Sequence, residues 1–164
     1  MKSKAALGNH PIHPMLVPIP IGAFFIALVG DVLFTVSPEE PFWYELSFTC
    51  IAIGIAFALL AAVFGAVDYF SVRMSSRAFR IATWHAAINL MVIAFYTASC
   101  FLRRHGAAMP ETRRPLAVGL AVIGFGLLGI SGWLGGKLAF EHRVGVVERT
   151  AEAAGRPVPE RAAS

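Results

Sequence analysis

The sequence has few charged residues and almost no cysteine. Charged residues make up 15% and hydrophobic residues 57% of its 164 positions, whereas a soluble domain has about 25% charged residues. This composition excludes an ordinary soluble domain, because the excess apolar surface must face lipid. Cys50 and Cys100 form no CxxC or CxxCH motif, which argues against a zinc ribbon, an iron–sulfur cluster or covalently attached haem. The net charge of +4 comes with no nucleic-acid-binding motif.

Long apolar runs predict an all-α fold, an integral membrane four-helix bundle. A transmembrane helix needs about 20 mostly apolar residues. Runs of this kind cover residues 15–36, 46–70, 81–102 and 116–140. They define a four-helix transmembrane domain over 15–142, between an N-terminal histidine- and proline-containing segment over 1–14 and a polar flexible tail over 143–164. Because no cleavage site follows the first run, we expect a retained helix rather than a signal peptide.

Proline and glycine shape the outer two spans. Pro14, Pro18 and Pro20 crowd the start of the first span, so its first turns should be irregular or kinked. The last span is rich in glycine, and Gly132 with Gly136 forms a GxxxG pair. Such a helix either packs closely against a neighbour, which includes a homo-oligomer, or leaves room for something flat beside it. We find no long internal repeat.

Basic residues are divided unequally between the two ends of the bundle. Four spans place both termini at one end, which carries ten of the 14 lysines and arginines. The opposite end carries Arg103, Arg104, Arg113 and Arg114. The positive-inside rule therefore predicts that both termini are cytoplasmic.

Most polar residues of the spans gather at the end that carries the termini. An ionisable group inside a membrane is costly and marks a candidate site. The candidates at this end are His10, His13, Asp68, His85, Lys137 and His142, with Asn89 one turn deeper than His85 on the same helix face. Because neutral imidazole is a good ligand for iron, copper or zinc, His13 and His85 could hold a metal.

Each of these residues also has a structural interpretation. The histidines of the N-terminal segment could bind only water or lipid headgroups. His85 could form a structural hydrogen bond to Asp68 or to a backbone carbonyl, because an unpaired polar group is costly in an apolar helix. Asp68 could instead pair with Arg73. Lys137 could extend its ammonium group to the interface.

The opposite end has fewer polar residues. Asp31 could pair with Arg103 or Arg104, or cap backbone groups. Cys50 and Cys100 both lie toward this end, so a disulfide is conceivable in an oxidising compartment. Two buried thiols are the interpretation we favour.

Four segments together resemble a bacterial membrane family known as domain of unknown function 2231. The opening segment is HPIHPMLVPIPIG at 10–22, and the closing segment is SGWLGGKLAFEHRVGV at 131–146. Between them, GAVD at 65–68 and WHAAIN at 84–89 also fit. The resemblance covers residues 8 to 147, which is nearly all of the apolar part of the chain.

The resemblance implies a bacterial inner-membrane protein with a redox function. The family is similar in general plan to small b-type cytochromes, and some members are joined to a Rieske-type iron–sulfur domain. This implies haem b as cofactor and electron transfer as function, with His13 and His85 as preferred ligands and His10 and His142 as alternates or propionate partners. The chain has Lys137 where similar sequences often have histidine. It has no Rieske motif, so a redox partner would be a separate chain.

Two other functions stay open from the sequence. A non-redox scaffold or small transporter subunit would use the polar cluster for structure or for a proton, and interrupted helices do occur at transporter sites. A stand-alone transporter is disfavoured because there is no inverted repeat. A membrane enzyme with a histidine-bound metal is the least favoured, since the chain has no HExxH motif and no base–nucleophile arrangement.

Overall fold

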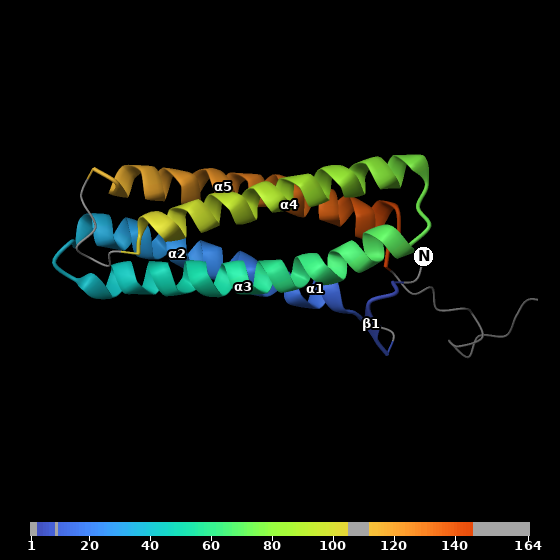
Figure 1. Cartoon of the computed structure of the whole chain (residues 1–164), viewed down its shortest axis with the longest axis horizontal. Coiled ribbons are helices and arrows are strands. Elements are labelled where there is room, and N and C mark those ends of the chain that lie inside the picture. Colours follow the sequence, from blue (N-terminus) through green and yellow to red (C-terminus); the bar gives the residue numbers. More distant parts are fainter. Residues whose placement is uncertain (1–2, 9, 105–111, 146–164) are drawn as a thin grey trace, which may run out of the picture.

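The computed structural model describes residues 3–8, 10–104 and 112–145, which form a four-helix bundle with the N-terminal segment and the end of the last helix at the same end (Figure 1). The elements in chain order are β1 Ala6–Leu7, β2 His10–Pro11, α1 Ile12–Leu16, α2 Pro18–Val36, α3 Pro41–Ser71, α4 Ser76–Leu102, α5 Arg114–Gly136 and η2 Lys137–Glu141. The η2 element is a π-helical turn that continues α5. The predicted tail lies outside the described residues beyond position 145.

Four helical spans are long and apolar enough to cross a membrane. They are Ile12–Val36, Pro41–Ser71, Ser76–Leu102 and Arg114–Glu141. Only 17% to 28% of the most apolar window of each span is buried inside the bundle, so most of their apolar side chains face outward, where lipid would cover them. This confirms the predicted all-α, membrane-spanning four-helix fold.

The helix starts follow local sequence rather than the ends of the apolar runs. Neither Pro18 nor Pro20 has an N–H to donate, but Val17 between α1 and α2 keeps helical backbone angles and donates to the His13 carbonyl, so the span Ile12–Val36 continues through it. Pro41 is the first residue of α3, a position where the missing N–H costs nothing. Ser75 caps α4, because its Oγ accepts a 3.3 Å hydrogen bond from the Ala78 N–H. Both α3 and α4 therefore extend beyond the apolar runs.

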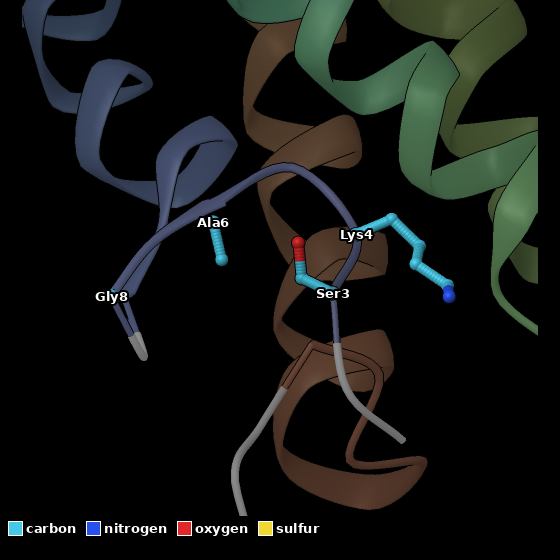
Figure 2. A pocket seen from close by; sticks show the side chains of 4 residues that line it. All are labelled: Ser3, Lys4, Ala6 and Gly8. Atoms are coloured by element: carbon cyan, nitrogen blue, oxygen red, sulfur yellow. The ribbon is translucent and has the colours of Figure 1, made fainter.

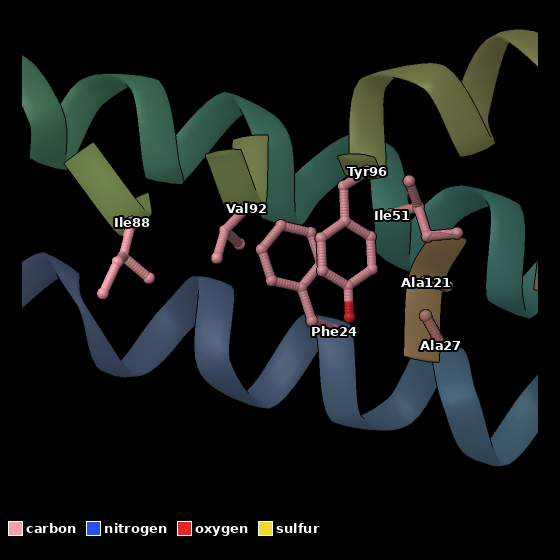
Figure 3. Packing of buried hydrophobic residues seen from close by; sticks show 7 residues of the cluster. All are labelled: Phe24, Ala27, Ile51, Ile88, Val92, Tyr96 and Ala121. Carbon is pink, nitrogen blue, oxygen red and sulfur yellow. The ribbon is translucent and has the colours of Figure 1, made fainter. Parts of the chain in front are cut away.

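The bundle consists of two helical hairpins. Helix α2 packs most closely on α3, and α4 on α5, while α3 with α4 and α2 with α5 make fewer contacts. We call the interface between the α2–α3 hairpin and the α4–α5 hairpin the seam. Its apolar core comprises Phe24, Ala27, Ile51, Ile88, Val92, Tyr96 and Ala121 (Figure 3). Both hairpins thus contribute to one shared core.

Candidate functional site

Three pairs of side chains meet across the seam, and the two members of each pair are 72 positions apart in the sequence. They are His13 with His85, Phe24 with Tyr96, and Asp31 with Arg103. Along each helix the members follow at intervals of 11 and then seven residues, which keeps them on one helix face. The two hairpins therefore meet in a regular register. We call the first pair the histidine layer and the last pair the ion-pair layer.

The middle pair is a stacked aromatic contact. The rings of Phe24 and Tyr96 lie 3.6 Å apart between centroids, at an angle of 7° (Figure 3). Glycines on the second helix of each hairpin make room for them. A Cβ atom at Gly54 would overlap the Phe24 ring, and one at Gly124 would lie 3.0 Å from the Tyr96 ring. These two glycines are 70 positions apart, so the correspondence extends to α3 and α5.

The ion-pair layer is buried and fully hydrogen-bonded. Arg103 and Asp31 are 2% and 5% exposed. The two terminal nitrogens of Arg103 donate to the two carboxylate oxygens of Asp31 at 2.6 and 2.8 Å. Ser47 donates to Asp31 at 2.7 Å, and the Arg103 Nε donates to Ser99 at 3.1 Å. The predicted pairing of Asp31 with Arg103 is therefore confirmed. An arrangement with this many charge-assisted bonds is a structural link between the hairpins.

The histidine layer is held by one ring nitrogen on each side. The Nδ1 of His13 lies 2.7 Å from the carbonyl oxygen of Ala61 in α3. The Nδ1 of His85 lies 2.9 Å from the carbonyl oxygen of Ser131 in α5 and 3.0 Å from its hydroxyl. The ring centroids are 6.2 Å apart and the rings are nearly perpendicular, at 88°. Both rings are half-buried.

The two histidine rings pack against equivalent positions of the two hairpins. A Cβ atom at Gly65 would lie 3.1 Å from the His13 ring, and one at Gly135 would lie 3.1 Å from the His85 ring. Each glycine stands one turn beyond the carbonyl that accepts the Nδ1 bond. Gly65 and Gly135 are also 70 positions apart. The contacts thus repeat between hairpins although the sequence shows no long repeat.

Sequence reasoning missed the residues that hold the histidines. Ser131, the Ala61 carbonyl and the two seating glycines were not among the candidates. A signal was nevertheless present, because His13 and His85 each precede an aromatic residue by 11 positions and a charged residue by 18. That shared spacing places the two histidines at equivalent positions on α1 and α4.

Other predicted site residues are arranged differently. Asn89 joins the histidine layer, since its Nδ2 lies 3.2 Å from His85 Nε2 and donates to the His85 carbonyl oxygen at 2.9 Å. His10 is exposed in β2. His142 follows η2, and its Nε2 is buried with no hydrogen-bond partner among the described residues. Lys137 begins η2 and lines a shallow apolar hollow there with Gly132 and Trp133.

Asp68 binds the N-terminal segment. Its carboxylate accepts hydrogen bonds from the Ser3 hydroxyl and from the backbone N–H groups of Lys4 and Ala5. The structure therefore corrects both predicted partners: within the described residues, Asp68 forms no hydrogen bond or ion pair with Arg73 or His85. The sequence could not reveal this, because the bond joins segments more than 60 positions apart.

Cysteine chemistry and multi-ligand metal sites receive no support from the geometry. Cys50 and Cys100 are free thiols, each partly buried. Within the described residues, no group of three or more His, Cys, Asp or Glu side chains is arranged to hold a metal ion. The His13–His85 pair therefore stands without a third protein ligand of these types in the described part of the chain.

These features define a class: a multi-pass membrane protein built from two helical hairpins that share a polar and aromatic seam. The model of the family described as predicted membrane proteins, DUF2231, matches residues 9–148. The chain belongs to this family. Comparison with curated proteins and with solved structures found no match.

Proposed function

We propose that this protein is a b-type cytochrome-like membrane subunit that binds haem b between His13 and His85 and transfers electrons. The observation that supports the proposal most directly is the ring separation of 6.2 Å. With metal–imidazole bonds of about 2.0 Å and about 1.1 Å from nitrogen to ring centre, two imidazoles that held one metal between them would have centres about 6.2 Å apart. The two distances agree.

The hydrogen bonds of the two rings would also suit histidines that hold haem. A ligating histidine commonly donates its other ring N–H to a carbonyl, which fixes the tautomer and the ring orientation. The carbonyls of Ala61 and Ser131 accept in this way from the two Nδ1 atoms. Each Nε2 is then left as the basic nitrogen that a metal needs. The Asn89 amide near His85 Nε2 would have to turn away on binding.

A pair of histidines suits haem better than a bare ion. Protein sites for zinc use three or four side-chain ligands. No group of three or more His, Cys, Asp or Glu side chains that could hold a metal occurs among the described residues. Haem would need only His13 and His85 from the protein, since the porphyrin supplies the other ligands of the iron. When bound, haem iron supplies one-electron redox chemistry. His13 and His85 would hold it across the seam between the hairpins, as bundle proteins place cofactors.

The distribution of basic residues supports cytoplasmic termini. Arg103 counts toward the opposite end in the sequence, yet it is buried against Asp31. It therefore contributes no loop charge to the positive-inside balance. Without Arg103, the opposite end counts three basic residues, against ten at the end that carries the termini. We infer that the histidine layer lies toward the cytoplasmic side, where a redox partner on a separate chain would approach.

The visible absorption spectrum of full-length protein, expressed with adequate haem and purified in detergent, tests the proposal. We expect a Soret band that His85→Ala and His13→Ala each abolish or shift. The matched control is His10→Ala, which removes an exposed histidine of the same segment and should leave the spectrum unchanged. A featureless wild-type spectrum, or a Soret band unaffected by His85→Ala, would overturn the assignment and leave a scaffold or transporter subunit as the better explanation.

A further inference from the structure

The two histidines of the candidate site differ in how their helices hold them. His85 stands in the third turn of α4, which runs without interruption for 27 residues. His13 is the second residue of α1, in the first turn of the span Ile12–Val36. The first N–H groups of a helix have no partner within it, and no side chain caps this helix start. The position of His13 therefore depends on contacts with the chain around the helix start.

Those contacts come from the chain that precedes α1. We call residues 3–8, 10 and 11 the strap. It crosses the end of the bundle, and Ser3, Lys4, Ala6 and Gly8 surround a hollow there (Figure 2). Its two short strands pair antiparallel, with Ala6 opposite Pro11 and Leu7 opposite His10. The Ala5 carbonyl accepts a 2.9 Å bond from the N–H of Ile12, the first residue of α1. The strap is thus tied directly to the residue before His13.

Asp68 fixes the other end of the strap. One carboxylate oxygen accepts from the Lys4 and Ala5 N–H groups at 2.9 and 3.1 Å, and the Ser3 hydroxyl lies 2.8 and 2.7 Å from the two oxygens. Ser3 and Ala5 are 5% and 8% exposed. Bonds from N–H groups to an ionised carboxylate are stronger than neutral ones. This anchor is therefore the strongest described attachment of the strap to α3.

The same face of α3 holds the strap and the His13 ring. Ala61, which accepts the Nδ1 bond, Gly65, which seats the ring, and Asp68 follow at intervals of four and three residues. This spacing puts them in one row on the helix. The corresponding position of the second hairpin is Leu138 in η2, 70 residues after Asp68, so the second hairpin has no equivalent carboxylate.

We propose that Asp68 is a positioning residue: by anchoring the strap it keeps the ring of His13 against Ala61 and Gly65, opposite His85. This role rests on the proposed haem site for its functional consequence, but the position of the His13 ring can be measured without haem. Without the anchor, α1 can leave α3 and the 6.2 Å separation of the rings is lost.

The test compares Asp68→Asn with wild type by two measurements on full-length protein in detergent. The first is the rate at which diethylpyrocarbonate modifies His13 before haem is added. It is followed by mass spectrometry and compared with the rate for N-acetylhistidine added to the same reaction. We expect Asp68→Asn to raise the His13 rate several-fold. Ser3→Ala, which removes one of the three donors, should raise it less. Glu141→Gln changes an exposed carboxylate at the same end and should have no effect.

The second measurement is haem affinity by titration at the Soret band. Loss of a group that orients a metal ligand typically lowers affinity about 10- to 100-fold, and we expect a loss in this range for Asp68→Asn. An unchanged His13 rate overturns the positioning role. A released His13 ring with unchanged haem affinity would instead overturn His13 as a residue that holds haem. If wild type binds no haem, the proposed function fails, and the His13 modification rate alone decides whether Asp68 positions the ring.

Discussion

The two polar ends of the seam illustrate opposite uses of buried polar groups. In the ion-pair layer, every nitrogen of the Arg103 guanidinium and both oxygens of Asp31 are hydrogen-bonded. In the histidine layer, backbone carbonyls hold the Nδ1 atoms, and the one hydrogen-bonding contact of an Nε2 among the described residues is the Asn89 amide at His85. A network in which every charged atom already has a partner leaves little capacity to bind anything else. The difference identifies the histidine layer as the candidate site and the ion-pair layer as the structural link.

The layers also differ in what they join. Asp31 on α2 and Ser47 on α3 both contact Arg103 at the end of α4, so the ion-pair layer ties three helices. Each histidine instead bonds to the second helix of its own hairpin. Only ring packing connects His13 to His85. A ligand between these rings would supply the missing connection at that end.

The largest expected effect is on the ion-pair layer. Arg103→Ala leaves the buried Asp31 carboxylate unpaired and should lower the free energy of unfolding by about 3–5 kcal/mol. Reversible unfolding in mixed detergent micelles measures this. The double variant Arg103→Met, Asp31→Leu removes both charges and should recover most of the loss. If the double variant is as unstable as Arg103→Ala, the ion pair does more than neutralise a buried charge.

A matched pair of serines compares the two layers directly. Ser47→Ala removes a hydroxyl that bonds both charged groups of the ion-pair layer, so unfolding should cost about 1.5–3 kcal/mol less. Ser131→Ala removes only a second contact to His85 Nδ1, because the backbone carbonyl stays in place. Its effect should be about 0.5–1.5 kcal/mol. Equal losses for the two serines, measured by the same unfolding assay, would remove the distinction between the layers.

The aromatic pair between the layers tests how closely the hairpins must approach. Gly54→Ala places a methyl group into the Phe24 ring and should destabilise the protein by about 1–3 kcal/mol through overpacking. Gly126→Ala is the matched control, since a Cβ there meets nothing within 4 Å. It should be neutral or slightly stabilising, because alanine is the better helix former. A neutral Gly54→Ala would show that the seam can widen freely.

The fold could be predicted from the sequence because the lengths of the apolar runs alone require four membrane spans. The end of the bundle at which the histidines lie could also be predicted, because the number of spans determines at which end each segment begins. A backbone carbonyl was one of the two partners expected for His85, and the Ser131 carbonyl confirms it. Which carbonyls of α3 and α5 bind His13 and His85 could not be predicted. Which carbonyl accepts depends on how each helix is rotated about its axis, and helices that are apolar on all sides carry little information on rotation.

The partners of Asp68 could not be predicted from the sequence either. Its charge and position suggested Arg73 or His85, which are close in sequence or similar in depth. The structure pairs it with Ser3, Lys4 and Ala5, because the strap folds back across the bundle end. Residues 3 to 5 gave no signal of this, since two of the three donors are backbone N–H groups, which every residue except proline has.

The smallest effect on stability, and the sharpest test of the histidine layer, is expected for Asn89→Ala. The Asn89 amide bonds the carbonyl of His85 one turn earlier in the same helix, so its loss should change unfolding by less than about 1 kcal/mol. The same amide lies 3.2 Å from His85 Nε2, the nitrogen that would bind iron. Removing this competitor should leave haem affinity equal or raise it, as measured by titration at the Soret band. A large loss of affinity would instead mean that Asn89 orients the His85 ring, and that the histidine layer needs its full network as the ion-pair layer does.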